Sequence, residues 1–490
     1  MPPAPARAAG RDLVAAVVGL VAAAVRVQAA LGSGLLSVGR YDDGVYYAAA
    51  VDLVHGVLPY RDVPLLQPPG IALATAPFAL IAQAVGDGGA LATARVVFAL
   101  VGGVNAALVV LLLRRWGAPA MVAGGLLDAL AFPAVYVERT VATEVLGTTG
   151  LLLALLAVQR AGPRRSLLGG ALAGAAIGLK VWYVLPFTVL LLCARGGAGG
   201  RIRFLVGGVL AGLVVFVPFF VADPTSMWRQ VVTAQLGRPE QAGTDALRRL
   251  SGLLGVSGPD GATTPLPAVP GDLLTIVLAA LVVLLAAIAW TDPAARVLVG
   301  LLASCVAVLL LSPSFLQHYA ALTAAPLSLV AGAAVPRAAG LLRRPRVAAV
   351  LAVAPVALAA VLWTGYDLVR LDRVPPVDAL RAAVDRVPGC VVADDPTVLA
   401  VLDRLTPDVA AGCRVEPDPS GAGYLVPGRV ERVEKPAFQR AILRYLWSGD
   451  AYLWVRGGGL QLDARTEASV RSGRVLLDRD GWTLRATPGR

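Results

Sequence analysis

The sequence predicts an α-helical polytopic membrane protein with about eleven spanning helices and a small α/β domain at its C-terminal end. Of its 490 residues, 57% are hydrophobic and only 15% are charged, whereas soluble globular domains carry about 25% charged residues. Apolar runs fill the chain from about residue 12 to about residue 366, and a spanning helix needs roughly 20 such residues. A soluble protein released from a signal peptide is therefore excluded.

The expected spans are apolar segments separated by short stretches of Gly, Pro and Arg. They lie near residues 12–31, 95–113, 119–137, 141–159, 166–183, 184–195, 203–222, 271–290, 296–313, 319–336 and 347–366.

The arginines predict the orientation of these spans. Cytoplasmic loops of membrane proteins carry an excess of Arg and Lys, and alternate connections of this chain do so. The arginines of those connections are Arg7, Arg11, Arg114, Arg115, Arg160, Arg164, Arg165, Arg195, Arg201, Arg203, Arg296, Arg337, Arg343, Arg344 and Arg346. We therefore expect a cytoplasmic N-terminus and an extracytoplasmic location for 32–94, 223–270 and the tail. This distribution explains the net charge of +11 without nucleic-acid binding.

The tail, residues 367–490, is expected to form a soluble extracytoplasmic α/β domain, and residues 1–366 the membrane module. Residues 371–490 hold 17 basic and 16 acidic side chains. Helical patterns at 376–387, 396–404, 435–448 and 464–472 alternate with β-prone segments at 390–393, 451–455, 474–478 and 482–486. Cys390 and Cys413 are candidates for a disulfide because the compartment is oxidising. With two histidines and no CxxC motif, a Cys/His zinc site is disfavoured.

The first outer segment, 32–94, carries the strongest functional signal, with juxtamembrane helices expected within it. It contains Asp-Asp-Gly-Val-Tyr from Asp42, Leu-Pro-Tyr-Arg-Asp from Leu58 and Gln-Pro-Pro-Gly from Gln67. Two adjacent carboxylates in a partly dehydrated site repel each other, which suits a general base or a metal ligand. On chemistry alone, a solvated N-cap of the following helix explains Asp42 and Asp43 equally well.

These three motifs resemble the first periplasmic loop of GT-C class glycosyltransferases that use polyprenyl-phosphate sugars. That group includes protein O-mannosyltransferases and lipid A aminoarabinose transferases. In it the loop usually begins Asp-Glu, with the first acid as the proposed base, and later carries Lys- or His-Pro-Pro. Here Asp43 replaces the Glu and Gln67 replaces the Lys or His. The Arg-rich, Lys-poor composition is most similar to that of actinobacterial envelope mannosyl- or arabinosyltransferases.

The resemblance implies that Asp42 is the catalytic base, with Asp43 beside it. Tyr46, Tyr60, Arg61 and Gln67 of the same loop are then expected to bind substrate.

Ionisable residues at membrane depth are the next candidates, because they are costly there and tend to be functional. Glu144 follows Arg139 at the outer end of a span and is expected in the active-site wall or at a metal, with a structural ion pair to Arg139 as the alternative. Lys180 is expected to hold a lipid phosphate together with an arginine such as Arg61 or Arg139, or else to snorkel at a helix end. His318 and Tyr319 lie where related transferases often carry an aromatic or His-Tyr pair near the donor, with a structural histidine at the interface as the alternative.

The predicted reaction is an inverting transfer of a sugar from a polyprenyl-phosphate donor to a hydroxyl of a glycan, glycolipid or protein. A divalent metal ion held by Asp42, Asp43 and Glu144 is a candidate cofactor. No nucleotide cofactor is expected, because no Gly-rich loop follows a strand. A secondary transporter and a non-catalytic envelope scaffold are the alternatives. Transporters commonly contain internal repeats, and the sequence shows no second copy of the 41–70 motifs. A scaffold would require those motifs to be incidental.

Overall fold

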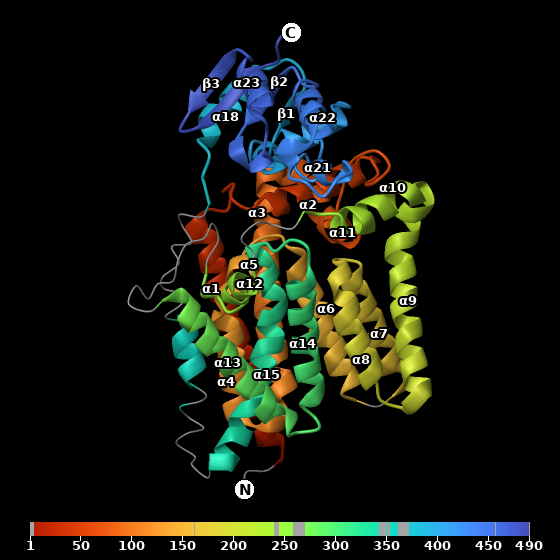
Figure 1. The fold of residues 1–490 in the computed structure, drawn as a ribbon, viewed down its shortest axis with the longest axis vertical. Helices are drawn as coiled ribbons and strands as arrows, with labels where there is room; N and C mark the ends of the chain where they lie inside the picture. The colour runs from red at the N-terminus through yellow and green to blue at the C-terminus, as the bar shows by residue number, and fades with distance from the viewer. Residues whose placement is uncertain are drawn as a thin grey trace. The chain divides into compact units, whose positions relative to one another are not determined.

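The chain forms two compact units, each built from three separate segments (Figure 1). A computed structural model describes residues 4–160, 162–239, 245–257, 270–342, 350, 353–360, 372–455 and 457–489. Unit 1 comprises Met1–Gly32, Val96–Val215 and Gln241–Leu368, and unit 2 comprises Ser33–Arg95, Phe216–Glu240 and Val369–Arg490.

The regular secondary structure in the described residues of unit 1 is helical. Its elements are α1 (Ala4–Ser33), the second part of α3 (Gly70–Leu113), η1 (Arg114–Trp116), α4 (Ala118–Leu130), α5 (Phe132–Glu138), α6 (Thr143–Val158), α7 (Pro163–Ile177), η2 (Val181–Tyr183), α8 (Val184–Cys193), most of α9 (Gly197–Ala222), α12 (Ala246–Leu253), α13 (Gly271–Trp290), α14 (Arg296–Leu311), η5 (Gln317–Ala320) and α15 (Ala321–Leu342).

Five helices of the described chain are long and apolar enough to cross a membrane, or six if α4 and α5, bent by 54°, form one span. Three shorter apolar helices lie at Thr143–Val158, Val181–Cys193 and Arg296–Leu311. The predicted multi-span helical fold is confirmed, whereas the predicted number of eleven is not established. The last expected span, 347–366, falls largely outside the described residues, although 350 and 353–360 are helical.

The apolar surface of unit 1 agrees with a lipid environment. Val214 in α9 is 75% exposed and Leu20 in α1 is 71% exposed. Leaving such side chains in water costs about 25 cal/mol per Å² of apolar area. Inside the unit, Gly174 of α7 lies so near α9 that an added Cβ would be 2.7 Å from the Cα of Gly208. Small residues at such crossings let helix backbones approach closely in membranes.

Helix α3 differs from its prediction. The sequence predicts a span near 95–113 that is separate from the juxtamembrane helices of the preceding segment, 32–94. The structure is helical from Gly70 to Leu113, with one non-helical residue, Gly86, at φ 75° and ψ 165°. A glycine adopts this positive φ without a Cβ clash, so the helix bends there and continues.

Unit 2 contains α2 (Tyr41–Val54), the first part of α3, the end of α9, and the short helices that follow it. The latter are α10 (Pro224–Trp228), the π-helix η3 (Arg229–Thr233) and α11 (Ala234–Leu236). The tail adds α18 (Val377–Val384), β1 (Val391–Ala393), α19 (Pro396–Val401), α20 (Leu405–Ala410), α21 (Ala422–Leu425), η6 (Arg432–Glu434), α22 (Pro436–Leu446), β2 (Ala451–Trp454), η7 (Gly457–Leu460), α23 (Ala464–Arg471), β3 (Val475–Arg479) and β4 (Trp482–Ala486).

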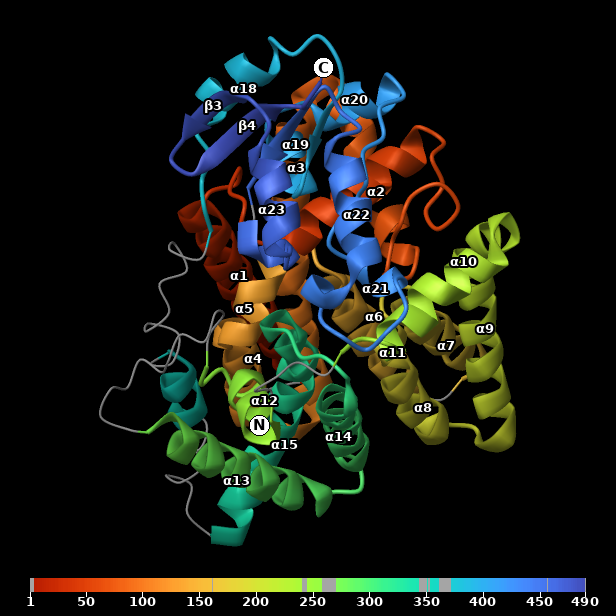
Figure 2. The same ribbon diagram turned by 45° about the horizontal axis from the view of Figure 1, so that its top comes forward.

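The tail forms the predicted small α/β domain around a four-stranded sheet of order β1-β2-β4-β3. Strands β1 and β2 are parallel, with Val392 opposite Tyr452, whereas β4 runs antiparallel to both β2 and β3. The β3–β4 hairpin is visible in both views of the ribbon (Figures 1 and 2). Phe438 and Ile442 of α22 pack against the sheet in one apolar cluster. Cys390 and Cys413 form a disulfide with Cα atoms 5.6 Å apart.

Candidate active site

The two adjacent aspartates of the first outer segment have different environments in unit 2. Both lie in the first turn of α2, where carboxylates interact favourably with the helix dipole. The N-cap is Arg40, which makes no side-chain cap hydrogen bond. Asp43 is fully buried, whereas Asp42 is only partly buried. The solvated N-cap considered for this pair therefore does not describe Asp43.

Asp43 is neutralised by an arginine that the sequence analysis did not single out. The Oδ2 atom of Asp43 lies 2.7 Å from Nη2 and 2.8 Å from Nε of Arg95, and Arg95 also donates to the carbonyl oxygen of Leu35 at 2.6 Å. Burial raises the pKa of the Asp43 carboxyl above its ordinary value, although Arg95 acts in the opposite direction. The Oδ1 atom of Asp43 has no hydrogen-bond partner among the described residues.

The residue before Asp42 is fixed by the tail. The Tyr41 hydroxyl donates to Oδ1 of Asp418 at 2.9 Å and accepts from the backbone N–H of Ser420 at 2.9 Å. Asp42 thus lies between Tyr41, tied to the tail, and Asp43, tied to Arg95. This fixes the backbone of the first turn of α2 on both sides of Asp42.

The remaining candidates of this loop have differing surroundings. Tyr46 is buried. Tyr60 is buried at a positive φ of 72°, and its hydroxyl donates to the carbonyl oxygen of Gln67 at 2.7 Å. The Gln67 side chain is partly exposed. Arg61 is exposed and pairs with Asp62 at 2.8 Å, so its charge is already partly compensated.

Three further candidates from unit 1, Glu144, His318 and Tyr319, come together around Lys180. Its ammonium lies 2.6 Å from Oε1 of Glu144 and 4.3 Å from the ring centroids of both Trp182 and Tyr319, the distance of a cation–π interaction. The His318 ring is 4.5 Å from the ring of Tyr319. The partner of Glu144 is therefore Lys180, and not Arg139, which was the alternative considered from the sequence.

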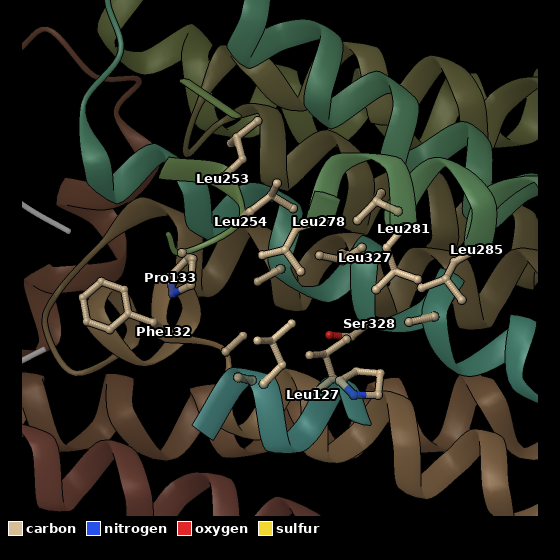
Figure 3. Close-up of a pocket in the computed structure, with 18 residues that line it drawn as sticks. Leu127, Phe132, Pro133, Leu253, Leu254, Leu278, Leu281, Leu285, Leu327 and Ser328 are labelled. Carbon is tan, nitrogen blue, oxygen red and sulfur yellow. The ribbon is translucent and has the colours of Figure 1, made fainter. Parts of the chain in front are cut away.

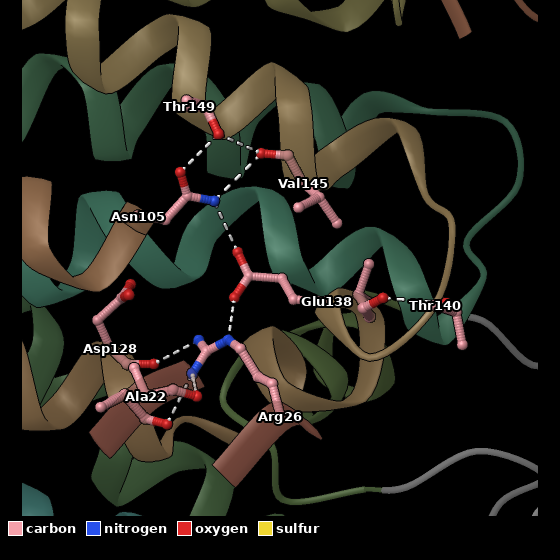
Figure 4. Close-up of polar contacts among 10 residues, drawn as sticks. Ala22, Arg26, Asn105, Asp128, Glu138, Thr140, Val145 and Thr149 are labelled. Carbon is pink, nitrogen blue, oxygen red and sulfur yellow. Dashed lines mark hydrogen bonds and ion pairs between the residues drawn. The ribbon is translucent and has the colours of Figure 1, made fainter. Parts of the chain in front are cut away.

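Arg139 is buried, and its guanidinium lies 5.3 Å from the ring centroid of Tyr136. The neighbouring residue, Glu138, belongs to a separate buried network (Figure 4). Its carboxylate accepts from Nε of Arg26 at 2.5 Å and from Nδ2 of Asn105 at 2.9 Å. Asn105 in turn accepts from the hydroxyl of Thr149 at 2.7 Å. An ion pair joins α1 to α5, and the hydrogen bonds of Asn105 extend the network to α3 and α6. Its sequence signal is the pair of Arg26 and Glu138 at the ends of apolar segments.

An apolar pocket also lies in unit 1, among α4, α5, α12, α13, α15 and residues 355–359 (Figure 3). Leu127, Leu254, Leu278 and Leu327 are among the side chains that line it. The one hydroxyl in its wall, that of Ser328, has no hydrogen-bond partner among the described residues. This lining suits a hydrocarbon chain better than a polar ligand.

Two of the predicted metal ligands, Asp43 and Glu144, have protein cations as partners. Asp43 is paired with Arg95, and Glu144 is paired with Lys180. Within the described ranges, no group of three or more His, Cys, Asp or Glu side chains is placed to hold a metal ion. Two of the three predicted ligands are thus already neutralised by protein cations.

Solved structures with the same fold cover nearly the whole chain. ArnT from Cupriavidus metallidurans bound to undecaprenyl phosphate is 17% identical, with a TM-score of 0.58 over 97% of this chain and 98% of that chain. The Archaeoglobus fulgidus oligosaccharyltransferase with Zn and sulfate is 14% identical, with a TM-score of 0.53 over 90% of this chain and 68% of that chain. AglB from the same organism, in complex with an inhibitory peptide and a dolichol-phosphate, has a TM-score of 0.51 at 14% identity over 90% and 69%. The predicted GT-C-like fold is confirmed.

A match in sequence extends this similarity to a family. No curated protein matches the sequence. Residues 66–313, just over half of the 490 residues, match the sequence model of Glycosyltransferase family 87. The matched segment includes Gln67, Arg139, Glu144 and Lys180, and it begins after Asp42 and Asp43. The predicted glycosyltransferase class is confirmed, and the chain belongs to glycosyltransferase family 87.

Proposed function

We propose that the chain transfers a sugar, such as mannose or arabinose, from a polyprenyl-phosphate donor to a hydroxyl of an envelope glycan, glycolipid or protein. The reaction takes place at the outer face of the cytoplasmic membrane. Membership of family 87 supports glycosyl transfer. Structures of the same fold that hold undecaprenyl phosphate and dolichol-phosphate support the class of donor.

The observation that carries the mechanism is the difference between Asp42 and Asp43. A general base must reach the proton that it removes. Asp43 is buried and paired with Arg95, whereas Asp42 is partly exposed on the same helical turn. Asp42 is therefore assigned as the base, and Asp43 as the group that positions the turn.

In this mechanism Asp42 accepts the proton of the acceptor hydroxyl while the oxygen of that hydroxyl attacks the anomeric carbon of the donor sugar. The bond between that carbon and the lipid phosphate oxygen breaks, and the phosphate leaves with the electron pair. Attack from the face opposite the phosphate inverts the configuration at the anomeric carbon. Because the leaving phosphate is anionic, cations near it lower the barrier without a proton transfer.

Lys180 is proposed as a contact of the lipid phosphate. Its ammonium is held by Glu144 and by the rings of Trp182 and Tyr319, so the charge is placed before a donor binds. His318 and Tyr319 are proposed to line the same part of unit 1. The apolar pocket of unit 1 is proposed to take part of the isoprenoid chain.

Protein cations, and not a metal ion, are proposed to balance the phosphate charge. Asp43 already pairs with Arg95 and Glu144 with Lys180, and carboxylates engaged in this way are poor ligands for a hard divalent ion. We expect transfer to continue in EDTA. A complete loss in EDTA that Mg²⁺ or Mn²⁺ restores would contradict this part of the proposal.

The first experiment measures transfer of labelled sugar from a panel of polyprenyl-phosphate donors to endogenous acceptors in membranes. Asp42→Asn is compared with wild type and with Asp385→Asn, the same change at an exposed position of the tail. Loss of a general base typically costs about 10²- to 10⁴-fold in rate, and we expect a loss of that order for Asp42→Asn only. The anomeric configuration of the product, measured by NMR, tests inversion.

Equal transfer by Asp42→Asn and wild type would refute the base assignment and leave glycosyl transfer intact. Absence of transfer from every donor by folded wild-type protein, alongside a competent control transferase, would refute the donor class. For Lys180, we expect Lys180→Met to raise KM for the donor more than it lowers kcat. The opposite pattern would show that Lys180 acts in the chemical step.

A further inference from the structure

A second cavity of unit 1 lies where arginines from three different connections meet. It has a volume of about 460 Å³, within the range of about 300–1,000 Å³ that is usual for small-molecule sites. Arg115 of η1, Arg195 after α8 and Arg296 at the start of α14 all line it. The cavity is far from the Lys180 cluster, because Glu144 lies in the first turn of α6, whereas Gln159, in the cavity wall, follows its last turn.

The charge of these arginines is not balanced within the described part of the chain. Arg115 lies over the ring of Trp116 at 5.1 Å, and Arg296 donates to the carbonyl oxygen of Trp290 at 3.3 Å. Neither forms an ion pair, and nor does Arg195, among the described residues. The nearest acid in sequence, Asp292, is held by Nε1 of Trp116 at 2.9 Å and by Arg337 at 3.3 Å. Three like charges therefore surround one cavity.

Apart from Gln159 and Cys193, the rest of the cavity wall is apolar. Leu155 and Val158 of α6 and Val189 and Leu192 of α8 form much of it, and Trp290 contributes an indole ring. Indole rings are enriched at the interface between lipid and water. A ligand that fits this wall has an anionic head and a hydrocarbon part. A soluble phosphate compound would use the arginines and leave the leucines and valines exposed.

We propose that this cavity binds the head group of an anionic phospholipid, with the phosphate between the arginines and the first part of an acyl chain against α6 and α8. Basic pockets between membrane helices on the cytoplasmic side recognise such head groups, and these three arginines belong to the connections that the positive-inside pattern assigns to that side. The site is distinct from the proposed sugar-transfer site and does not depend on it.

Cys193 provides a probe, since it lines the cavity and is exposed. The chain has four cysteines, of which Cys305 is buried and the other two form the disulfide. Full-length protein is placed in nanodiscs of phosphatidylcholine alone or with phosphatidylglycerol. The labelling rate of Cys193 by a neutral thiol reagent is measured in each, with Cys193→Ser as the blank.

Each arginine near an anionic lipid contributes a factor of about five in affinity, so we expect phosphatidylglycerol to slow labelling several-fold in wild type. In the triple variant Arg115→Gln/Arg195→Gln/Arg296→Gln, phosphatidylglycerol should no longer slow the labelling of Cys193. Its matched control, Arg160→Gln/Arg164→Gln/Arg165→Gln, removes the same charge from a neighbouring connection that does not line the cavity. In this control, phosphatidylglycerol should slow labelling as it does in wild type. Within each variant, the labelling rate with phosphatidylglycerol is divided by the rate without it, which removes any effect of the arginines on the thiol itself.

Three results would overturn the proposal. Phosphatidylglycerol could leave wild-type labelling unchanged, which would mean that no lipid occupies the cavity. It could protect the triple variant as well as wild type, which would indicate general enrichment of anionic lipid around the protein. Inorganic phosphate could protect Cys193 fully in phosphatidylcholine nanodiscs, which would assign the cavity to a soluble anion.

Discussion

At the scale of single residues, the buried pair of Asp43 and Arg95 determines how the two adjacent acids differ. The sequence showed two equivalent carboxylates, and nothing in it indicated which one a cation would neutralise. Arg95 lies 52 residues away from Asp43, and its signal was only that it interrupts an apolar stretch. The pairing of Tyr41 with Asp418, 377 residues apart, left no sequence signal. Residue types at the site were predictable, whereas their partners were not.

We expect Arg95→Met to destabilise the protein by about 3–5 kcal/mol, because removing one partner leaves a buried charge uncompensated. The double variant Asp43→Leu/Arg95→Met should recover most of this loss, since it removes both charges. Thermal unfolding of purified full-length protein in detergent measures both. Equal destabilisation of the single and double variants would show that the loss comes from packing or from the lost bond to Leu35.

Asp52, on the same helix, should make stability depend on pH. It is buried, its Oδ2 has no hydrogen-bond partner among the described residues, and burial raises the pKa of its carboxyl well above the ordinary value of 3.8. The folded state then binds the proton more tightly than the unfolded state, so stability decreases as pH rises from about 4 towards the raised pKa. Asp52→Asn should remove this decrease.

Thermal midpoints of wild type and Asp52→Asn between pH 4.5 and 8 test this expectation. The two proteins should differ least at the acidic end, where Asp52 is protonated, and the variant should be the more stable one at the alkaline end. Parallel curves would show that Asp52 does not titrate differently in the folded protein.

At the scale of elements, the tail was predicted most accurately. The β-prone segment at 482–486 corresponds to β4, and the helical segment at 464–472 corresponds to α23 with one residue fewer. Alternating apolar pattern and turn residues are local signals, so short elements between clear turns can be read from sequence. The course of α3 could not be read in this way, because Gly86 looks like a turn whether the helix stops or bends there.

The packing of α2 on α19 within unit 2 depends on one glycine. A Cβ atom at Gly44 would lie 2.6 Å from the backbone nitrogen of Thr397 and 2.7 Å from its Cα, so backbone would have to move. We expect Gly44→Ala to destabilise the protein by about 1–3 kcal/mol, the usual range for overpacking. Gly212→Ala in α9 is the matched control, as no atom lies within 4 Å of its added Cβ. Similar thermal midpoints for both variants would contradict this account of the α2–α19 contact.

At the scale of the whole molecule, the predicted orientation places the tail outside the cytoplasm, where its disulfide is chemically stable. In a Cys193→Ser background, we expect Arg440→Cys to react with a membrane-impermeant maleimide in intact cells. Arg164→Cys should react only after the cells are permeabilised. Both positions are exposed. Labelling of Arg164→Cys in intact cells would invert the proposed topology and also move the lipid site to the outer leaflet.

Unit 2 is built from three segments that are synthesised at different times. Tyr41 leaves the ribosome 377 residues before Asp418, and at about 5–20 residues per second this delay is roughly 20–75 s. During that time α2 has been synthesised, but the tail helix α19 that packs against it has not. The surface of α2 that packs against α19 therefore stays uncovered until the later membrane helices and the first part of the tail have been synthesised. The proposed base becomes fixed in position only when synthesis is nearly complete.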